Sequence, residues 1–179
     1  MNQEKELWEL YPHIWKTKAA FFNYVRGAIR RALWERFPVK LEFKNENVHK
    51  PPPYYTGRGK SGAICALSGE FEIKSKLEVD HIKGNQSLQD WDDLTPFVKH
   101  LCANKDNLQL VTKSAHKIKS YADRLGISYE EAQVIKEAIQ ICKGDDKKWL
   151  YDRGLTPGSN AKIRRTQVEE RLKMEILSF

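Results

Sequence analysis

An aspartate and a histidine stand side by side in the stretch EVDHIKG, at Asp80 and His81. They follow Leu77 and Val79, which alternate as the buried positions of a β-strand do. Neighbouring side chains of a strand point to opposite faces, so the carboxylate and the imidazole cannot both serve the core. At a strand end they can instead flank one substrate atom from two sides. The pair is therefore a candidate reactive site that needs partners.

Two such partners occur in the stretch DNLQLVTKSAHKIKS, namely Asn107 and His116. Asn107 precedes a second strand pattern, and His116 falls in the first turns of the helix pattern that follows. Taken singly, a histidine is more often a hydrogen-bonded polar group than a ligand, and an asparagine before a strand is commonly a turn residue. Histidine, asparagine and histidine in the order strand, strand, helix are harder to dismiss.

Short strands and one helix must position these residues. Alternating apolar residues predict strands near 64–67, 70–73, 77–82 and 108–111. Between the last two, Thr95 and Pro96 are suited to the N-cap and the first position of a helix. The segment from Ile64 to Val111 is therefore expected to be mixed, and the fold class to be α+β.

Helical patterns flank this segment on both sides. Apolar residues recur at helical spacing from Thr17, a suitable N-cap, to Arg36, with Pro38 just beyond. Three patterns follow downstream: one from about Lys113 to Leu125 closed by Gly126, one opened by the capping box SYEE at 128–131, and one over about 159–177. The proline- and glycine-rich stretch KPPPYYTGRGKSG is expected to be a linker or binding loop.

The charge balance points to a polyanionic partner. The chain has 179 residues, with 31 Lys and Arg against 24 Asp and Glu, and a formal net charge of +7. Nucleic acid is the first expectation and an anionic membrane the second, while a merely basic globular protein is the alternative. Arg26, Arg30 and Arg31 form a basic ridge on the first helix pattern that can lie along a phosphate backbone or be a solvated face.

The cysteines and the hydropathy of the chain exclude several classes of protein. The three cysteines, Cys65, Cys102 and Cys142, form no CxxC pair, so neither a disulfide framework nor a zinc ribbon of the usual spacing is expected. No apolar run approaches the ~20 residues of a membrane span, and no secretory signal is expected. The GKS at 59–61 is not a phosphate-binding loop, because its first glycine would fall at Tyr54. We expect an intracellular protein that does not bind a membrane.

The linked motifs resemble the ββα-metal motif of the HNH endonuclease family. VDHI matches its first strand, NLQLV its second and HKIK its helix, with eight residues between Asn107 and His116. The resemblance covers roughly residues 64–124. It implies an HNH nuclease core over 51–126, between an N-terminal helical extension, 1–50, and a C-terminal one, 127–179.

The resemblance also implies a mechanism for hydrolysing DNA phosphodiester bonds. His81 would be the general base, Asn107 would orient it through a hydrogen bond, and Asp80 and His116 would hold one divalent cation. One carboxylate, one imidazole and several waters suit Mg²⁺, or Mn²⁺ in its place. The residues expected to contact DNA are Arg26, Arg30, Arg31, Lys119, Arg164 and Arg165.

The sequence departs from the family at the zinc positions that brace many members. Cys65 is present, but Ser68, Thr112 and Ala115 stand where the other three ligands would be. One cysteine of four cannot hold a structural zinc, so none is expected and apolar packing must replace it.

Two other function classes compete with a nuclease. The first is a nucleic-acid-binding protein on a decayed nuclease scaffold, in which loss of the cysteines would be a sign of general decay. Against it, Asp80, His81, Asn107 and His116 are all present, whereas a decayed site should have lost at least one of them. A helical interaction module would explain the terminal helices and leave the central motif unexplained. The resemblance favours a phage or mobile-element origin, and hence the host cytoplasm. Target, nicking or double-strand cutting, and monomer or homodimer are left open.

Overall fold

The computed structural model describes residues 5–84 and 86–177, so the first four residues of the N-terminal extension, Asn85 and the last two residues lie outside the described residues. The fold is α+β, with helices and two small antiparallel sheets of two strands each. The chain divides into two compact units, 1–112 and 113–179. This division differs from the three expected segments, because the N-terminal helices share a unit with the strands and the helix after β4 belongs to the second unit.

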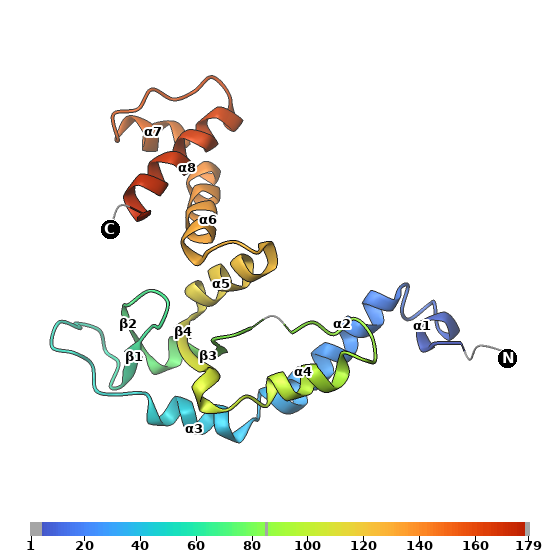
Figure 1. Cartoon of the computed structure of the whole chain (residues 1–179). Helices are drawn as coiled ribbons and strands as arrows, with labels where there is room; N and C mark the ends of the chain where they lie inside the picture. Colours follow the sequence, from blue (N-terminus) through green and yellow to red (C-terminus); the bar gives the residue numbers. More distant parts are fainter. Residues whose placement is uncertain (1–4, 85, 178–179) are drawn as a thin grey trace. The chain divides into compact units, whose positions relative to one another are not determined.

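The first unit contains the four strands found among the described residues. In chain order its elements are α1 (Leu7–Leu10), α2 (Lys18–Ile29), the π-helix η1 (Arg30–Trp34), α3 (Pro38–Glu46), β1 (Gly62–Ile64), β2 (Phe71–Ile73), the 3₁₀-helix η2 (Lys74–Lys76), β3 (Leu77–His81), α4 (Leu94–Leu101), the 3₁₀-helix η3 (Lys105–Asn107) and β4 (Leu108–Thr112) (Figure 1).

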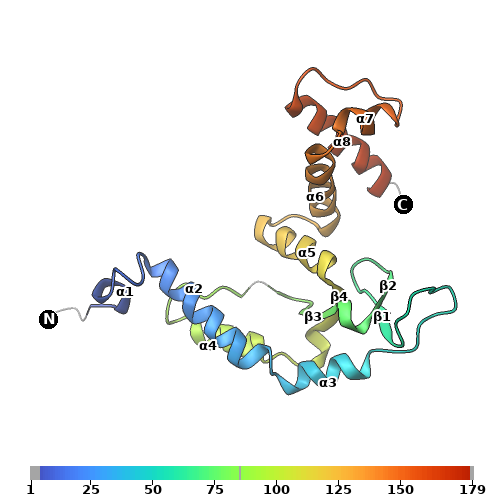
Figure 2. The same cartoon turned by 180° about the vertical axis from the view of Figure 1, so that it is seen from behind.

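The second unit is helical over its described residues. It contains α5 (Lys113–Leu125), α6 (Tyr129–Lys143), α7 (Asp146–Tyr151) and α8 (Ala161–Leu177), and Figure 2 shows them from behind. Its core consists of Val134, Ala138, Leu150, Val168 and Leu172. The short helix α7 is absent from the sequence-based prediction, which has three helices here. The Asp145 side chain caps α7 by accepting the Lys148 N–H at 2.9 Å. In the sequence this N-cap belongs to the stretch GDD at 144–146, which is also typical of a turn.

The β3–β4 hairpin positions the candidate site. β3 and β4 pair antiparallel, with Asp80 opposite Gln109 and His81 opposite Leu108. Leu77 and Val79 face the core of the first unit, together with Leu108 and Leu110. His81 is the next residue on that same face, since side chains alternate along a strand. Asp80 lies on the opposite face, as expected.

The first core joins α2, η1 and α4 to this hairpin. Phe21 and Phe22 of α2, Trp34 of η1, and Phe97 and Leu101 of α4 all belong to it. The expected helix N-cap is confirmed, because the Thr17 hydroxyl accepts the Ala20 N–H at 3.1 Å. The helix expected up to Arg36 is α-helical to Ile29 and continues as a π-helix over 30–34, where the backbone widens. A π-turn shifts the helical register, and such turns are frequent at functional sites.

Two further boundaries differ from the expectation. The helix of the β3–β4 insert has Asp93 as its N-cap and begins at Leu94, two residues before the expected N-cap Thr95 and first position Pro96. The strand expected at 64–67 is found at 62–64, because Cys65 to Gly69 form a turn that requires a positive φ of 71° at Gly69. Within the described ranges, no helix has both the length and the apolar run that crossing a bilayer needs.

Candidate functional site

His81 is enclosed between two other rings. Its imidazole stacks on Trp34 with ring centroids 4.3 Å apart, and on His100 with centroids 4.4 Å apart. The residue is only 5% exposed. Trp34 comes from η1 and His100 from α4, so both neighbours of the ring lie far from it in sequence. The insert between the two strands thus supplies one wall of the site, a role that its sequence did not indicate.

The environment of His81 keeps its ring neutral. Burial lowers the pKa of His81 to about 4, the positive charges of His100 and Arg30 act in the same direction, and the Asp80 carboxylate acts against them. A neutral imidazole can accept a proton at physiological pH. Its Nε2 atom is buried and has no hydrogen-bond partner among the described residues.

An unpaired buried nitrogen is a cost that the fold bears at this position. Leaving a buried polar atom without a partner costs about 1–3 kcal/mol, and such atoms are uncommon in native proteins. Water reaching Nε2 would recover part of that free energy. Trp34 and His100 cover the two faces of the ring, whereas the Nε2 lone pair lies in the ring plane.

Asp80 lies on the other face of β3 and is also buried. Its Oδ2 atom accepts a hydrogen bond from Gln109 Nε2 at 3.1 Å, across the hairpin. Arg30 lies close enough for the Asp80 carboxylate to raise its pKa, although burial and Arg26 outweigh this and the net shift is downward. A buried carboxylate that is already held by a neutral amide is oriented before a cation arrives.

Asn107 fastens the end of β3. Its Oδ1 accepts the Lys83 N–H at 2.9 Å, its Nδ2 donates to the Lys83 carbonyl at 3.4 Å, and its own carbonyl accepts the Ile82 N–H at 2.9 Å. The family resemblance implies a hydrogen bond from Asn107 to the His81 imidazole, whereas these hydrogen bonds join Asn107 to Ile82 and Lys83. Asn107 thus holds the backbone immediately after His81, and positions the ring only indirectly.

The expected metal ligands are divided between the two units. Asp80 belongs to the first unit, and His116 lies near the start of α5 in the second. Within the described ranges, no three His, Cys, Asp or Glu side chains are grouped so as to hold a cation. A carboxylate and an imidazole are nevertheless donors that suit Mg²⁺ or Mn²⁺ when water fills the other positions. Their sharing of one cation stays a prediction.

Cys65 lies in a turn that hydrogen bonds close. Its N–H donates to the Glu70 carbonyl, its carbonyl accepts the Gly69 N–H, and its Sγ accepts the Thr112 N–H at 3.4 Å. Burial alone would raise the pKa of Cys65, but hydrogen bonds from Ser68, Thr112 and Leu67 to the sulfur lower it overall. Protein donors thus stabilise the sulfur in this turn, and the expectation that no zinc is bound stays a prediction.

The cations expected to contact DNA differ in how available they are. In the first unit, Arg26 and Arg30 are half-buried and Arg31 is exposed. In the second, Lys119 pairs with Asp123 at 3.2 Å, and Arg165 pairs with Glu169 at 2.8 Å. Ion pairs within one helix offset part of the charge that a phosphate would meet, so Lys119 and Arg165 are weaker candidates than the ridge on α2 and η1.

Arg164 has a structural contact that its sequence did not reveal. Its Nε donates to Asp146 Oδ2 at 2.9 Å, and the two side chains are 15% and 12% exposed. This pair ties α8 to the start of α7 within the second unit. A cation held in this way is tied to a largely buried carboxylate, and its removal leaves that carboxylate without compensation.

We expect Arg164→Ala to destabilise the second unit by about 2–3 kcal/mol, near the lower end of the ~3–5 kcal/mol for broken buried pairs, since both side chains keep some exposure. Arg165→Ala is the matched control, because it removes the same charge from an exposed pair and should cost at most about 1 kcal/mol. Urea unfolding and hydrogen exchange of the α7 and α8 amides measure both. Equal stabilities would show that the Asp146 contact contributes little.

Comparisons with protein-family models, curated proteins and solved structures find no match to this chain. The resemblance to the HNH family therefore rests on the quoted sequence motifs.

Proposed function

We propose that the chain is a divalent-metal-dependent endonuclease of the HNH type that hydrolyses DNA phosphodiester bonds. The observation that carries the proposal is the end of β3. There Asp80 and His81 occupy opposite faces, Asn107 fixes the backbone that follows them, and the chain runs on through β4 into the helix that bears His116. Strand, strand and helix follow one another in the order of the motif.

In this proposal each residue has one task. Asp80 and His116 hold the cation, which when bound supplies positive charge for the phosphate and the departing oxygen. His81 accepts a proton from the attacking water at Nε2, the ring atom that has no hydrogen-bond partner within the described residues. Gln109 orients the Asp80 carboxylate, and Asn107 fixes the strand end.

The enclosure of His81 adds a requirement to the mechanism. Water must reach the buried Nε2 before the proton can be transferred, so some of the atoms that cover it must move. We expect DNA binding to precede the exposure of the base.

A non-catalytic DNA-binding protein on the same scaffold is the second candidate. The same enclosure favours it, because a residue without a catalytic task can be buried by its neighbours at little functional cost. The basic balance of the chain suits both candidates equally. Only the second predicts that the protein binds DNA but never cuts it.

The test is cleavage of supercoiled plasmid by the purified protein. With Mg²⁺ or Mn²⁺ we expect nicked or linear products, and with chelator we expect none. Asp80→Ala is the control against a contaminating nuclease and should leave the plasmid uncut. Binding without cleavage under every metal condition would favour the second candidate. Cleavage that survives in Asp80→Ala would place the activity outside this site.

A further inference from the structure

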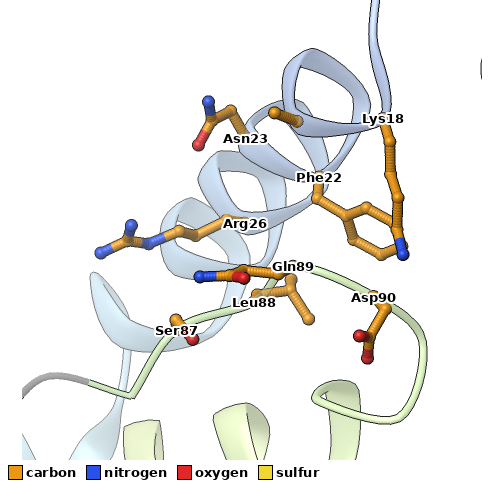
Figure 3. Close-up of a pocket in the computed structure, with 9 residues that line it drawn as sticks. Lys18, Phe22, Asn23, Arg26, Ser87, Leu88, Gln89 and Asp90 are labelled. Carbon is orange, nitrogen blue, oxygen red and sulfur yellow. The ribbon is translucent and has the colours of Figure 1, made fainter.

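The first unit contains a pocket between α2 and the segment 87–90, and none of the rings that enclose His81 lines it (Figure 3). Its volume is about 480 Å³, within the ~300–1,000 Å³ of pockets that hold small ligands. Phe22 and Leu88, which are 1% and 5% exposed, form its apolar part. The remaining lining residues are Lys18, Ala19, Asn23, Arg26, Ser87, Gln89 and Asp90.

The polar groups of the pocket fall into two chemical kinds. Lys18 and Arg26 supply positive charge, while Asn23, Ser87 and Gln89 supply neutral donors and acceptors. Phosphate is bound by the first kind, and amide side chains can read the edge of a base. A site for phosphate alone would need no amides or apolar floor, and a site for an apolar ligand would need no arginine.

Arg26 is the cation best placed to receive an anion. Within the described ranges it makes no ion pair and no hydrogen bond. Burial is the largest cause of the lowered pKa of Arg30, and the charge of Arg26, one turn earlier along the helix, is the next. In Figure 3 the Arg26 and Gln89 side chains extend to the same side of the pocket. Arg30 already lies in the field of Glu35 and Asp80, so an incoming phosphate is drawn first to Arg26.

Asp90 is the acidic residue of the pocket, and its carboxylate binds backbone N–H groups. Its Oδ1 accepts the N–H groups of Asp92 at 3.1 Å and Asp93 at 3.2 Å, at the entrance to α4. It lies at the end of the pocket nearer to Lys18, which can balance its charge (Figure 3). The end that Arg26 and Gln89 form keeps its positive character.

The arginines also connect the pocket to the candidate site. Arg30 is close enough to Asp80 and His81 for its charge to act on both. A strand whose phosphate lies at Arg26 would have its next nucleotides directed towards the end of β3. The pocket is therefore placed to hold a nucleotide near the phosphate that is to be cut.

We propose that the pocket between α2 and residues 87–90 binds one unpaired nucleotide of the DNA strand, with its phosphate at Arg26 and its base edge at Asn23 and Gln89. The choice of DNA rests on the proposed function. The nucleotide must be unpaired, because the bases of an intact duplex are stacked and paired inside it. The chain then prefers DNA that is bulged, gapped or frayed over an intact duplex.

The test is fluorescence anisotropy in the presence of chelator, with a labelled duplex and the same duplex carrying a one-nucleotide bulge. We expect the bulged DNA to bind about tenfold more tightly or better, because extruding a base from an intact duplex costs a few kcal/mol. Arg26→Ala should weaken binding of the bulged DNA and lower its salt-dependence slope by about one. Equal affinities of the wild type for the two DNAs would overturn the proposal.

Filling the pocket provides a test that leaves every charge in place. Ala19 lines the pocket and Ala20, the next residue of α2, does not, while both are exposed. Ala19→Phe should reduce the preference for bulged DNA to about one, and Ala20→Phe should retain it. A preference that survives in Ala19→Phe would show that the bulge is bound elsewhere.

Two further outcomes separate this proposal from its alternatives. Competition by free deoxynucleotide monophosphates as effective as that by bulged DNA would identify a free nucleotide as the occupant, and would overturn the assignment to a strand. Because binding is measured without metal, a preference for the bulge in a protein that never cuts plasmid would support the pocket and refute the endonuclease. Cleavage without the preference would do the reverse.

Discussion

His81→Ala is expected to lower plasmid cleavage by ~10²–10⁴-fold, the usual effect of removing a general base. DNA binding and divalent-ion binding should stay near those of the parental protein, because His81 lies on the face of β3 opposite Asp80 and is not an expected ligand. Asp80→Ala and His116→Ala should weaken divalent-ion binding as well as cleavage. Calorimetric metal titration, anisotropy and plasmid nicking, applied to all three variants, separate base from ligand.

The burial of His81 makes a folding control necessary. Alanine would leave a space between Trp34 and His100, so His81→Gln, which keeps more of the volume, should be measured beside it. His100→Gln is the matched control within the same stack: it disturbs the packing to a similar extent but removes no proposed base, so it should retain most of the cleavage. Loss of metal binding in His81→Ala, or nicking at the parental rate, would show that the assignment is wrong.

Local chemistry made some elements predictable from the sequence. A hydroxyl suited to an N-cap at Thr17, the capping box at Ser128, and Gly126 after α5 each act on backbone groups a few residues away, and each is found as expected. The same holds for the alternation of Leu77 and Val79, which assigns His81 to one face of β3 and Asp80 to the other. Interactions of short sequence range can be deduced from the order of residues alone.

The surroundings of His81 could not be predicted in the same way. Trp34 and His100 reach it from elements 47 residues before and 19 residues after it, and no motif links the three positions. The π-turn that orients Trp34 also breaks the helical period on which the prediction of a uniform helix relied. A histidine in the insert and a tryptophan in a long amphipathic helix both look like ordinary side chains until packing brings them together.

The contacts of Arg164 were unpredictable for a related reason. In the sequence it stands beside Arg165 in a basic run, and the two look equivalent. On α8, neighbouring side chains point about 100° apart, so one faces Asp146 of α7 and the other faces solvent. A cluster of cations thus mixes residues that hold the fold with residues available to a partner, and only the packing of the helices separates them.

The second large effect concerns pH and stability in the presence of chelator. The unfolded chain has an ordinary histidine pKa near 6.5, whereas burial lowers the pKa of His81 to about 4 in the folded state. Between these values the unfolded state binds more protons, so the free energy of unfolding falls as pH falls. The contribution is complete above pH ~6.5 and is lost progressively towards pH ~4, with an upper limit of about 3 kcal/mol.

The control for this effect is His81→Phe, which keeps an aromatic ring between Trp34 and His100 but cannot be protonated. The other charged groups near His81 are His100, Arg30 and Asp80, and both proteins contain them. Both also contain carboxylates such as Glu175, whose pKa is lowered by its hydrogen bond with Arg171. The difference between the two proteins therefore reports on His81. Urea unfolding at pH 7.5, 5.5 and 4.5 should therefore show a smaller loss of stability in His81→Phe than in the parental protein. Parallel curves for the two proteins would mean that His81 is protonated as readily in the folded chain as in the unfolded one, and that burial does not lower its pKa.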